Sequence, residues 1–435
     1  MSVFNVPLDL IRCVLFPMLT YRDLGNLSGV CSEWRSYIVT KHARQLCDSL
    51  GASETCKESQ MSPLELLDLW NSGQSSLACG DSHAAMVTRN GHVLLWRENT
   101  CRTRIPLALS PREPTAIGIS CGHHHTMILL SNGTVLAFGR NDRGQLGLTD
   151  KNDRDEPCMI QSKERFEAVK AGENFTLFLT RRNTLAWTGL LNIASNGIVN
   201  EVAIPTEIPF PQRKQGERIV SISAGARHIL VLTNLGRLLS AGDADVQLLG
   251  RSISSEQKAS ELNPVQFAWR PENASIVQIA AGLSHSLVLF GDGSVFTFGT
   301  SSSGELGLPR FSDASTAQPI PNLPKAIAVS AGSHHSLILT VTKNKIVAFG
   351  MGALGQLGYR ASFWSSTYPR DSLLPKDERK RIKYLAAGNG FSACLSGDGE
   401  DLFACGRTSL CAGAGNGSKS GNVIASFSRV PEMEL

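Results

Sequence analysis

The 435-residue sequence has few of the features that mark membrane, secreted or metal-binding proteins. No apolar run approaches the ~18 residues that a membrane-spanning helix needs, and the first residues lack the order of a signal peptide. The 11 cysteines are odd in number and include no C-x-x-C pair, which argues against a disulfide framework and against a common zinc pattern. We therefore expect reduced thiols, no membrane segment, and a cytoplasmic or nuclear location.

Catalytic signatures are missing as well. The sequence has no G-x-x-x-x-G-K-[ST], no H-E-x-x-H and no G-x-S-x-G, and the segment GAGNGSKS at 413–420 lacks the spacing of a phosphate loop. The net charge is only +4, which is too small a surplus to indicate nucleic-acid binding. The basic run PKDERKRIK at 375–383 is more typical of a solvated loop. We predict a non-catalytic protein without a cofactor and without nucleic acid as a partner.

Glycine, by contrast, is abundant, and its 40 residues reveal an internal repeat. Seven segments share a glycine, two variable residues, a histidine or phenylalanine, and then an apolar run. These anchor glycines lie 42 to 57 residues apart: Gly80, Gly122, Gly172, Gly225, Gly282, Gly332 and Gly388. The fourth position of each segment, here named the slot, holds His83, His125, Phe175, His228, His285, His335 and Phe391. Half of the ten histidines therefore occupy one repeated position.

A second glycine follows the anchor at a nearly fixed distance. In six copies it lies 17 or 18 residues later, as Gly139 does after Gly122, whereas the first copy has Arg97 there. Turn pairs such as Asn132-Gly133 lie between the two glycines and supply the positive φ values of tight two-residue turns. A constant hairpin within copies of variable length predicts a rigid strand pair with variable loops outside it.

A third element, G-[QE]-L-G, follows the hairpin in three copies, within 142–148, 302–308 and 353–359. A loop and one more apolar strand then lead to the next anchor, which gives about four short strands per ~50 residues. Because one such sheet cannot bury both of its faces, we predict seven sheets arranged radially. The fold class is then an all-β seven-bladed β-propeller over residues 77–435. We further expect the C-terminal segment FSRVPEMEL, residues 427–435, to complete the first blade and close the ring.

The pattern of G-x-x-H, a later glycine and G-Q-L-G resembles the repeats of the regulator of chromosome condensation (RCC) family of propellers. The resemblance covers residues 77–435 and is clearest in the second, fifth and sixth copies. No Trp-Asp pair and no Gly-Gly pair occurs, which argues against WD-type and kelch-type blades. Some members of the RCC family are guanine-nucleotide exchange factors for the Ran GTPase. The resemblance therefore implies an exchange factor or a chromatin-associated scaffold as one of two functions.

The segment CGHHHTMILL at 121–130 raises the question of a metal site, because it holds three consecutive histidines. His125 fills the slot, whereas His123 and His124 fill the two variable positions before it. Neighbouring side chains on a β-strand point to opposite faces, so three consecutive histidines cannot all converge on one ion. We therefore predict a structural role for His125 and no metal site.

The first 76 residues contain no repeat unit and have a helical pattern. Pro7 lies where a helix begins, and apolar residues follow at helical spacing. After a polar stretch, SPLELLDLW at 62–70 has a serine at the helix N-cap position and a proline directly after it. We predict a small all-α domain at 1–50, a helical linker at 51–76 and the propeller from 77 onward.

Residues 6–35, VPLDLIRCVLFPMLTYRDLGNLSGVCSEWR, resemble an F-box. The matching positions are Val6, Pro7, Leu10, Leu15, Leu19, Leu24, Leu27, Val30, Cys31 and Trp34, with Val6 in place of the usual leucine. The resemblance implies that these residues bind a Skp-type adaptor, and through it a cullin. The chain would then be the substrate receptor of an SCF-type ubiquitin ligase, with an unknown client protein on the propeller. The alternative is a helical cap on the propeller, in which Leu24 and Trp34 are ordinary core residues.

Overall fold

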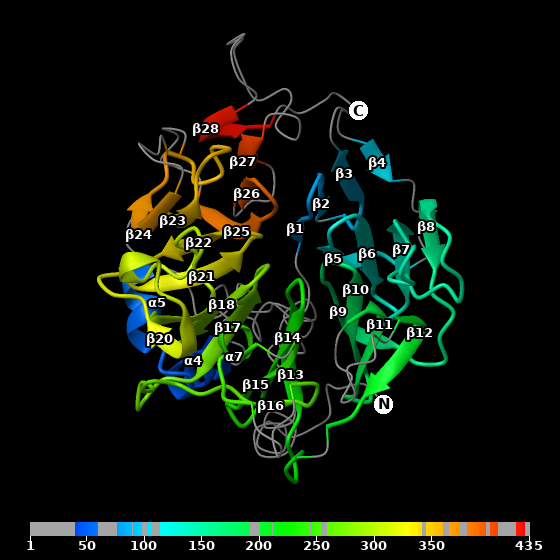
Figure 1. Cartoon of the computed structure of the whole chain (residues 1–435), viewed down its shortest axis with the longest axis horizontal. Helices are drawn as coiled ribbons and strands as arrows, with labels where there is room; N and C mark the ends of the chain where they lie inside the picture. The colour runs from blue at the N-terminus through cyan, green and yellow to red at the C-terminus, as the bar shows by residue number, and fades with distance from the viewer. Residues whose placement is uncertain are drawn as a thin grey trace.

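The computed structural model describes residues 40–59, 76–88, 90–97, 103–105, 114–191, 201–210, 212–243, 245–253, 259–341, 345–359, 365–374, 381–396, 401–407 and 423–430. Seven four-stranded antiparallel sheets surround a central axis (Figure 1), so the predicted seven-bladed β-propeller is confirmed. The F-box positions between Val6 and Trp34 lie outside the described residues, and the predicted all-α domain stays a prediction. Among the described residues no helix is both long and apolar enough to cross a membrane.

Each blade consists of four strands that follow one another along the chain. Blade 1 has β1 (Leu77–Cys79), β2 (His83–Val87), β3 (Val93–Arg97) and β4 (Thr103–Ile105). Blade 2 has β5 (Ala116–Cys121), β6 (His125–Leu130), β7 (Val135–Gly139) and β8 (Arg154–Met159). Blade 3 has β9 (Phe166–Ala171), β10 (Phe175–Thr180), β11 (Leu185–Leu190) and β12 (Glu201–Ile208). Blade 4 has β13 (Ile219–Ala224), β14 (His228–Thr233), β15 (Leu238–Gly242) and β16 (Asn263–Pro264), with the short helix α7 (Val246–Leu249) between the last two strands.

The remaining three blades repeat this order. Blade 5 has β17 (Ile276–Ala281), β18 (His285–Phe290), β19 (Val295–Gly299) and β20 (Ala314–Pro319), the last preceded by the 3₁₀ turn η5 (Pro309–Phe311). Blade 6 has β21 (Ala326–Ala331), β22 (His335–Thr340), β23 (Ile346–Met351) and β24 (Ser365–Asp371). Blade 7 has β25 (Ile382–Ala387), β26 (Phe391–Ser396), β27 (Leu402–Arg407) and β28 (Val423–Arg429).

The hairpin predicted from the two glycines is the pair formed by the second and third strands of each blade. In blade 2 the slot residue His125 pairs directly with Gly139, and the other five glycine-bearing copies have the same register. Gly139 has a φ of 104°, and a Cβ there would lie 2.4 Å from the carbonyl oxygen of His124. Only glycine fits this backbone without strain. Since this glycine always pairs with the slot residue, its distance from the anchor glycine in the sequence is nearly constant.

The way in which the ring closes differs from the prediction. Strand β28 pairs with β27, so the C-terminal segment completes blade 7, and the expectation that it completes blade 1 was wrong. The fourth strand of blade 1 is instead β4, which pairs with β3 in the same blade. Every blade thus builds its outer strand from the segment that follows its own hairpin. Blades 7 and 1 meet through apolar packing in which Leu77 and Phe391 share one cluster.

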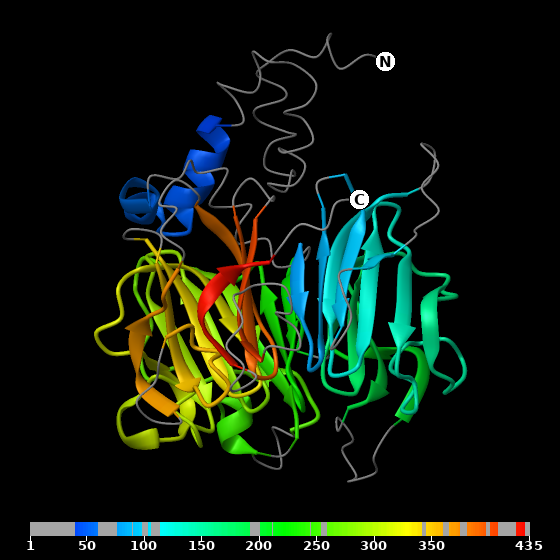
Figure 2. The same cartoon turned by 90° about the horizontal axis from the view of Figure 1, so that it is seen from above.

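Two helices pack against one face of the propeller. Helices α4 (Thr40–Ser49) and α5 (Ser53–Ser59) lie on the side that carries the turns of the hairpins, here named the hairpin face (Figure 2). The carbonyl oxygen of Leu50 accepts a 3.1 Å hydrogen bond from the N–H of Ser275, and the Thr55 hydroxyl donates to the carbonyl of Gly291 at 2.8 Å. The opposite side carries the anchor glycines and is named the anchor face. Residues 40–59 are therefore attached to the hairpin face.

Candidate functional site at the hub of the propeller

The seven anchor glycines approach one another around the central axis. A Cβ built on any of them would lie 2.4 to 2.7 Å from the carbonyl oxygen of the anchor glycine in the next blade, and Gly388 faces Gly80 in this way. None of the seven has a positive φ. Close approach between backbones, rather than an unusual backbone conformation, is the reason that glycine is needed at these positions.

The slot histidines link neighbouring blades through their side chains. The Nε2 atom of His125 lies 3.0 Å from the hydroxyl of Thr176, which follows the slot of blade 3. Four more histidines make the same contact at 2.8 to 3.0 Å; the pairs are His83–Thr126, His228–Ser286, His285–Ser336 and His335–Ser392. The Thr176 hydroxyl donates its own hydrogen to the carbonyl of Gln145 at 2.8 Å, so it accepts from the imidazole N–H. The slot is therefore a structural joint between blades.

Two slots hold phenylalanine, and their neighbours differ accordingly. The residue that follows the slot of the next blade is Ile229 beyond Phe175 and Ala84 beyond Phe391. A buried imidazole needs a polar partner, whereas a buried phenyl ring is stabilised by an apolar one. The hydroxyls at the position after the slot are the functional groups that our reading of the sequence missed. The signal was present, because a serine or threonine stands there only when the preceding copy has histidine in its slot.

Burial fixes the protonation state of these histidines. It lowers the pKa of His83 and His285 to about 4 and that of His125, His228 and His335 to about 3. All five side chains are almost entirely buried, so they are neutral at neutral pH and out of reach of a ligand. They are not acid–base groups for a reaction on a bound molecule.

The G-[QE]-L-G loops have a structural explanation too. The side chain of Gln145 accepts a 2.9 Å hydrogen bond from the N–H of Arg143 and so closes the loop, and Glu305 and Gln356 do the same in their copies. The carbonyl of each of these residues accepts the hydroxyl that also bonds the slot histidine. The third repeated element thus holds the hydroxyl that joins two blades.

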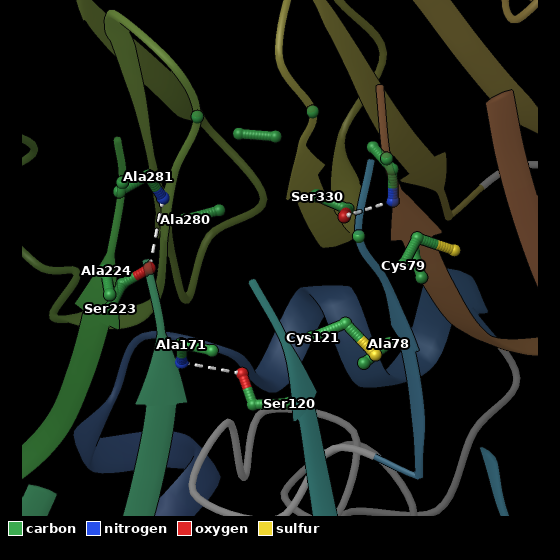
Figure 3. Close-up of a pocket in the computed structure, with 18 of the residues that line it drawn as sticks. Ala78, Cys79, Ser120, Cys121, Ala171, Ser223, Ala224, Ala280, Ala281 and Ser330 are labelled. Atoms are coloured by element: carbon green, nitrogen blue, oxygen red, sulfur yellow. Dashed lines mark hydrogen bonds between the residues drawn. The ribbon is translucent and has the colours of Figure 1, made fainter. Parts of the chain in front are cut away.

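A channel runs along the axis and encloses a cavity of about 310 Å³. The position two residues before each anchor lines it and carries a small side chain in six blades: Ala78, Ser120, Ser223, Ala280, Ser330 and Ala386. The Ser120 hydroxyl accepts a 2.9 Å bond from the N–H of Ala171, and Ser223 accepts one of 3.0 Å from Ala281 (Figure 3). The seventh residue at this position is Lys170, whose pKa is lowered to about 8 by burial. These bonds tie the channel wall together between blades.

The rim of the channel on the anchor face contains the rest of the triple histidine. His123 and His124 lie in the bend before β6, and only His125 is in the strand. The alternation of faces that we invoked against a metal site therefore does not apply to the first two. Their Nε2 atoms lie 3.1 and 3.8 Å from the same oxygen of Asp81 in blade 1. The structure brings these three side chains together and separates them from His125.

Comparison with known proteins identifies the repeats. A model of the regulator of chromosome condensation (RCC1) repeat matches residues 132–179 and 292–339, and a second model of that repeat matches 116–145 and 276–305. The matched residues lie in blades 2 and 3 and in blades 5 and 6. The chain therefore contains RCC1 repeats within a seven-bladed propeller, as the resemblance implied.

Relatives of known identity share part of the sequence. The chain is 28% identical over 319 residues to the ultraviolet-B receptor UVR8 of Arabidopsis thaliana. The aligned region covers 69% of this chain and 70% of that receptor. It is 25% identical over 289 residues to the probable E3 ubiquitin-protein ligase HERC6 of Homo sapiens. This aligned region covers 63% of this chain but only 28% of the ligase. The crystal structure of Prp20p from Saccharomyces cerevisiae is similar with a TM-score of 0.60 and 20% identity, over 73% of this chain and 77% of that one. These similarities agree with the RCC1 repeats and the propeller fold described above.

Proposed function

We propose that this protein is a non-catalytic substrate receptor, whose propeller binds a client protein and whose N-terminal segment binds a Skp-type adaptor of an SCF-type ubiquitin ligase. It would work in the cytoplasm or nucleus. The observation that carries the proposal is the attachment of α4 and α5 to the hairpin face. Since α4 and α5 cover part of the hairpin face, we place the client on the opposite, anchor face.

The contacts that attach the helices are specific. Cys47 and Ala52 are 1% and 0% exposed and belong to the apolar cluster that includes Leu289 of blade 5. Lys325 pairs with Glu54 at 2.8 Å and with Glu58 at 3.2 Å. A receptor needs such a fixed connection between its adaptor-binding part and its client-binding part, because the client has to be held at a defined place relative to the ligase. Burial of these side chains supports a fixed connection rather than a flexible tether.

Two further observations support this function. The pattern of ten F-box positions from Val6 to Trp34 precedes α4 directly in the sequence. The similarity to a probable ubiquitin ligase, over 63% of this chain, joins a propeller of this type to ubiquitin transfer in a known protein. The slot histidines of the hub bond to hydroxyls of the neighbouring blades, which suits a binding scaffold.

The test is binding of a purified Skp-type adaptor to the full-length chain, compared with the Leu24→Ala/Trp34→Ala double variant. We expect saturable binding by the wild type and at least a tenfold loss in the double variant, because apolar anchors dominate such interfaces. Glu33→Ala is the matched control, since this position is not part of the F-box pattern. Circular dichroism establishes that all three proteins are folded. Absence of binding by the folded wild type would refute the adaptor-binding function.

Guanine-nucleotide exchange is the second candidate, and the likeness to Prp20p favours it. That protein's structure was described together with its binding to Gsp1p and histones. If this chain is an exchange factor, it accelerates the release of fluorescent GDP from a Ran-type GTPase, and the Leu24→Ala/Trp34→Ala variant does so equally well. An unchanged release rate would leave the receptor as the supported function.

A further inference from the structure

The rim of the anchor face holds a cluster of three potential metal ligands. The Nε2 atoms of His123 and His124 approach one oxygen, Oδ2 of Asp81, and the two imidazole rings are stacked with their centroids 4.1 Å apart. All three ligand atoms lie within 4.8 Å of one another. Ligands at 2.0 to 2.2 Å from a tetrahedral zinc ion are about 3.4 Å apart, so small side-chain movements bring these atoms into that geometry.

We propose that Asp81, His123 and His124 form a binding site for Zn²⁺, with three protein ligands and one open coordination position. Imidazole nitrogen and carboxylate oxygen are donors that zinc prefers, and three protein ligands with a fourth open position recur in zinc proteins. The two imidazoles are 35% and 36% exposed and the carboxylate is 16% exposed. An ion can therefore reach the site from solvent.

The surroundings of the cluster hold it in place. Asn389 of blade 7 donates its side-chain N–H to Oδ1 of Asp81, which leaves Oδ2 for the ion. The N–H of Asp81 donates to the carbonyl of His123 at 3.2 Å, so the two ligand-bearing segments are joined through their backbones. Arg140, a cation that interacts with His124, is paired with Asp142 at 2.7 Å. Partners of this kind orient metal ligands and raise the affinity of a site.

Because the site lies between blades, a bound ion would affect the stability of the ring. Asn389, Asp81 and the two histidines come from blades 7, 1 and 2, so the site adjoins the junction at which the first and last blades meet. That junction has Phe391 in its slot and lacks the histidine–hydroxyl bond. A bound ion would tie blade 1 to blade 2 beside it. Since the unfolded chain does not assemble the three ligands, zinc binding would raise the melting temperature.

The first experiment is calorimetric titration of the EDTA-treated full-length chain with Zn²⁺, and the same titration of Asp81→Asn, His124→Ala and Asn389→Ala variants. We expect one strong site in the wild type and at least a tenfold loss of affinity in each variant, because even partners outside the ligand set change metal affinity by about 10- to 100-fold. His334→Ala is the matched control. It removes a histidine from the corresponding position of blade 6, where it faces Glu305 and follows Ser333 instead of a second histidine.

Two further measurements separate this site from the cysteines, of which the chain has 11. Co²⁺ that is bound by cysteine thiolates shows an intense charge-transfer absorption, whereas Co²⁺ bound by nitrogen and oxygen does not. For the Co²⁺-loaded wild type we therefore expect visible d–d bands and no thiolate charge-transfer band. Zinc should also raise the melting temperature of the wild type and the His334→Ala variant, but not of His124→Ala. Equal zinc affinity in the wild type and the Asp81→Asn and His124→Ala variants would overturn the site. The outcome is independent of adaptor binding, so it does not depend on the proposed function.

Discussion

The seven junctions between neighbouring blades are of two kinds. Five have a histidine in the slot and a serine or threonine opposite it, between blades 1 and 2, 2 and 3, 4 and 5, 5 and 6, and 6 and 7. Two have phenylalanine opposite an apolar residue, between blades 3 and 4 and between blades 7 and 1. The two phenylalanine junctions thus divide the ring into blades 1–3 and blades 4–7. The close contact between anchor glycines is the same at all seven junctions. The two kinds of junction therefore differ in whether the buried slot side chain has a polar or an apolar partner.

The largest effect is expected where the two kinds of junction are alike. Gly332→Ala at a histidine junction and Gly388→Ala at a phenylalanine junction should each lower the free energy of unfolding by more than about 4 kcal/mol. A Cβ would lie 2.6 and 2.7 Å, respectively, from a backbone carbonyl oxygen of the next blade. Urea unfolding of both variants measures this.

Gly236→Ala is the control for the glycine substitutions. It lies in a turn with a φ of 69°, and no atom lies within 4 Å of a Cβ built there. We expect it to cost only about 1 kcal/mol, from backbone strain alone. If Gly388→Ala costs no more than this control, the hub is not shared by the two kinds of junction.

The next largest effect comes from converting one kind of junction into the other. Phe175→His places an imidazole opposite Ile229, where Nε2 has no partner, and should lower the free energy of unfolding by about 3 kcal/mol. Adding Ile229→Thr supplies the hydroxyl and should restore more than about 1 kcal/mol of this. Urea unfolding of the wild type, both single variants and the double variant gives the coupling energy. Additive effects would mean that the histidine–hydroxyl pair does not stabilise the junction.

These pairs also show what a sequence makes accessible and what it does not. The glycines, the slot and the hairpin could be predicted because each recurs at the same place in nearly every copy of the repeat. The hydroxyl of Thr176 was missed because a hydroxyl occurs at this position only where the previous copy has histidine in its slot, so the position does not repeat in every copy. The closure by β28 was misjudged because the same segment can complete either blade 7 or blade 1 without any change in its pattern. The cluster at Asp81 depends on a bend that places His123 and His124 before the strand.

A smaller effect should follow from removing only the hydroxyl. Ser336→Ala leaves the Nε2–H of His285 without its 3.0 Å partner and should cost about 2 kcal/mol. Ser336→Thr is the matched control, since Thr126 and Thr176 occupy the same position elsewhere, and it should stay within about 0.5 kcal/mol of the wild type. Thermal or urea unfolding distinguishes the two. Equal stability of the alanine and threonine variants would show that the hydroxyl is dispensable.

The smallest expected effect is the dependence of the free energy of unfolding on pH, to which only the histidine junctions should contribute. Burial lowers the pKa of His285 to about 4, below the value of about 6.5 in the unfolded chain. Between these values the unfolded chain binds a proton that the folded chain does not, so the stability present above about pH 6.5 is lost as the pH falls toward 4. Each histidine adds up to about 1.4 kcal/mol per pH unit to this loss.

Urea unfolding at several pH values in this window measures the slope. In the double variant His285→Phe/Ser336→Ala, which imitates a phenylalanine junction, we expect a slope smaller by up to the contribution of one histidine. The same slope as in the wild type would show that His285 does not titrate on unfolding. Hydrogen exchange locates the effect in the ring, because protonation of a slot histidine places a positive charge and a second N–H donor in a buried site. As the pH falls, amide protection should therefore decrease at the five histidine junctions before it decreases at the two phenylalanine junctions. Earlier loss of protection at the phenylalanine junctions would show that the histidine junctions are not the acid-sensitive ones.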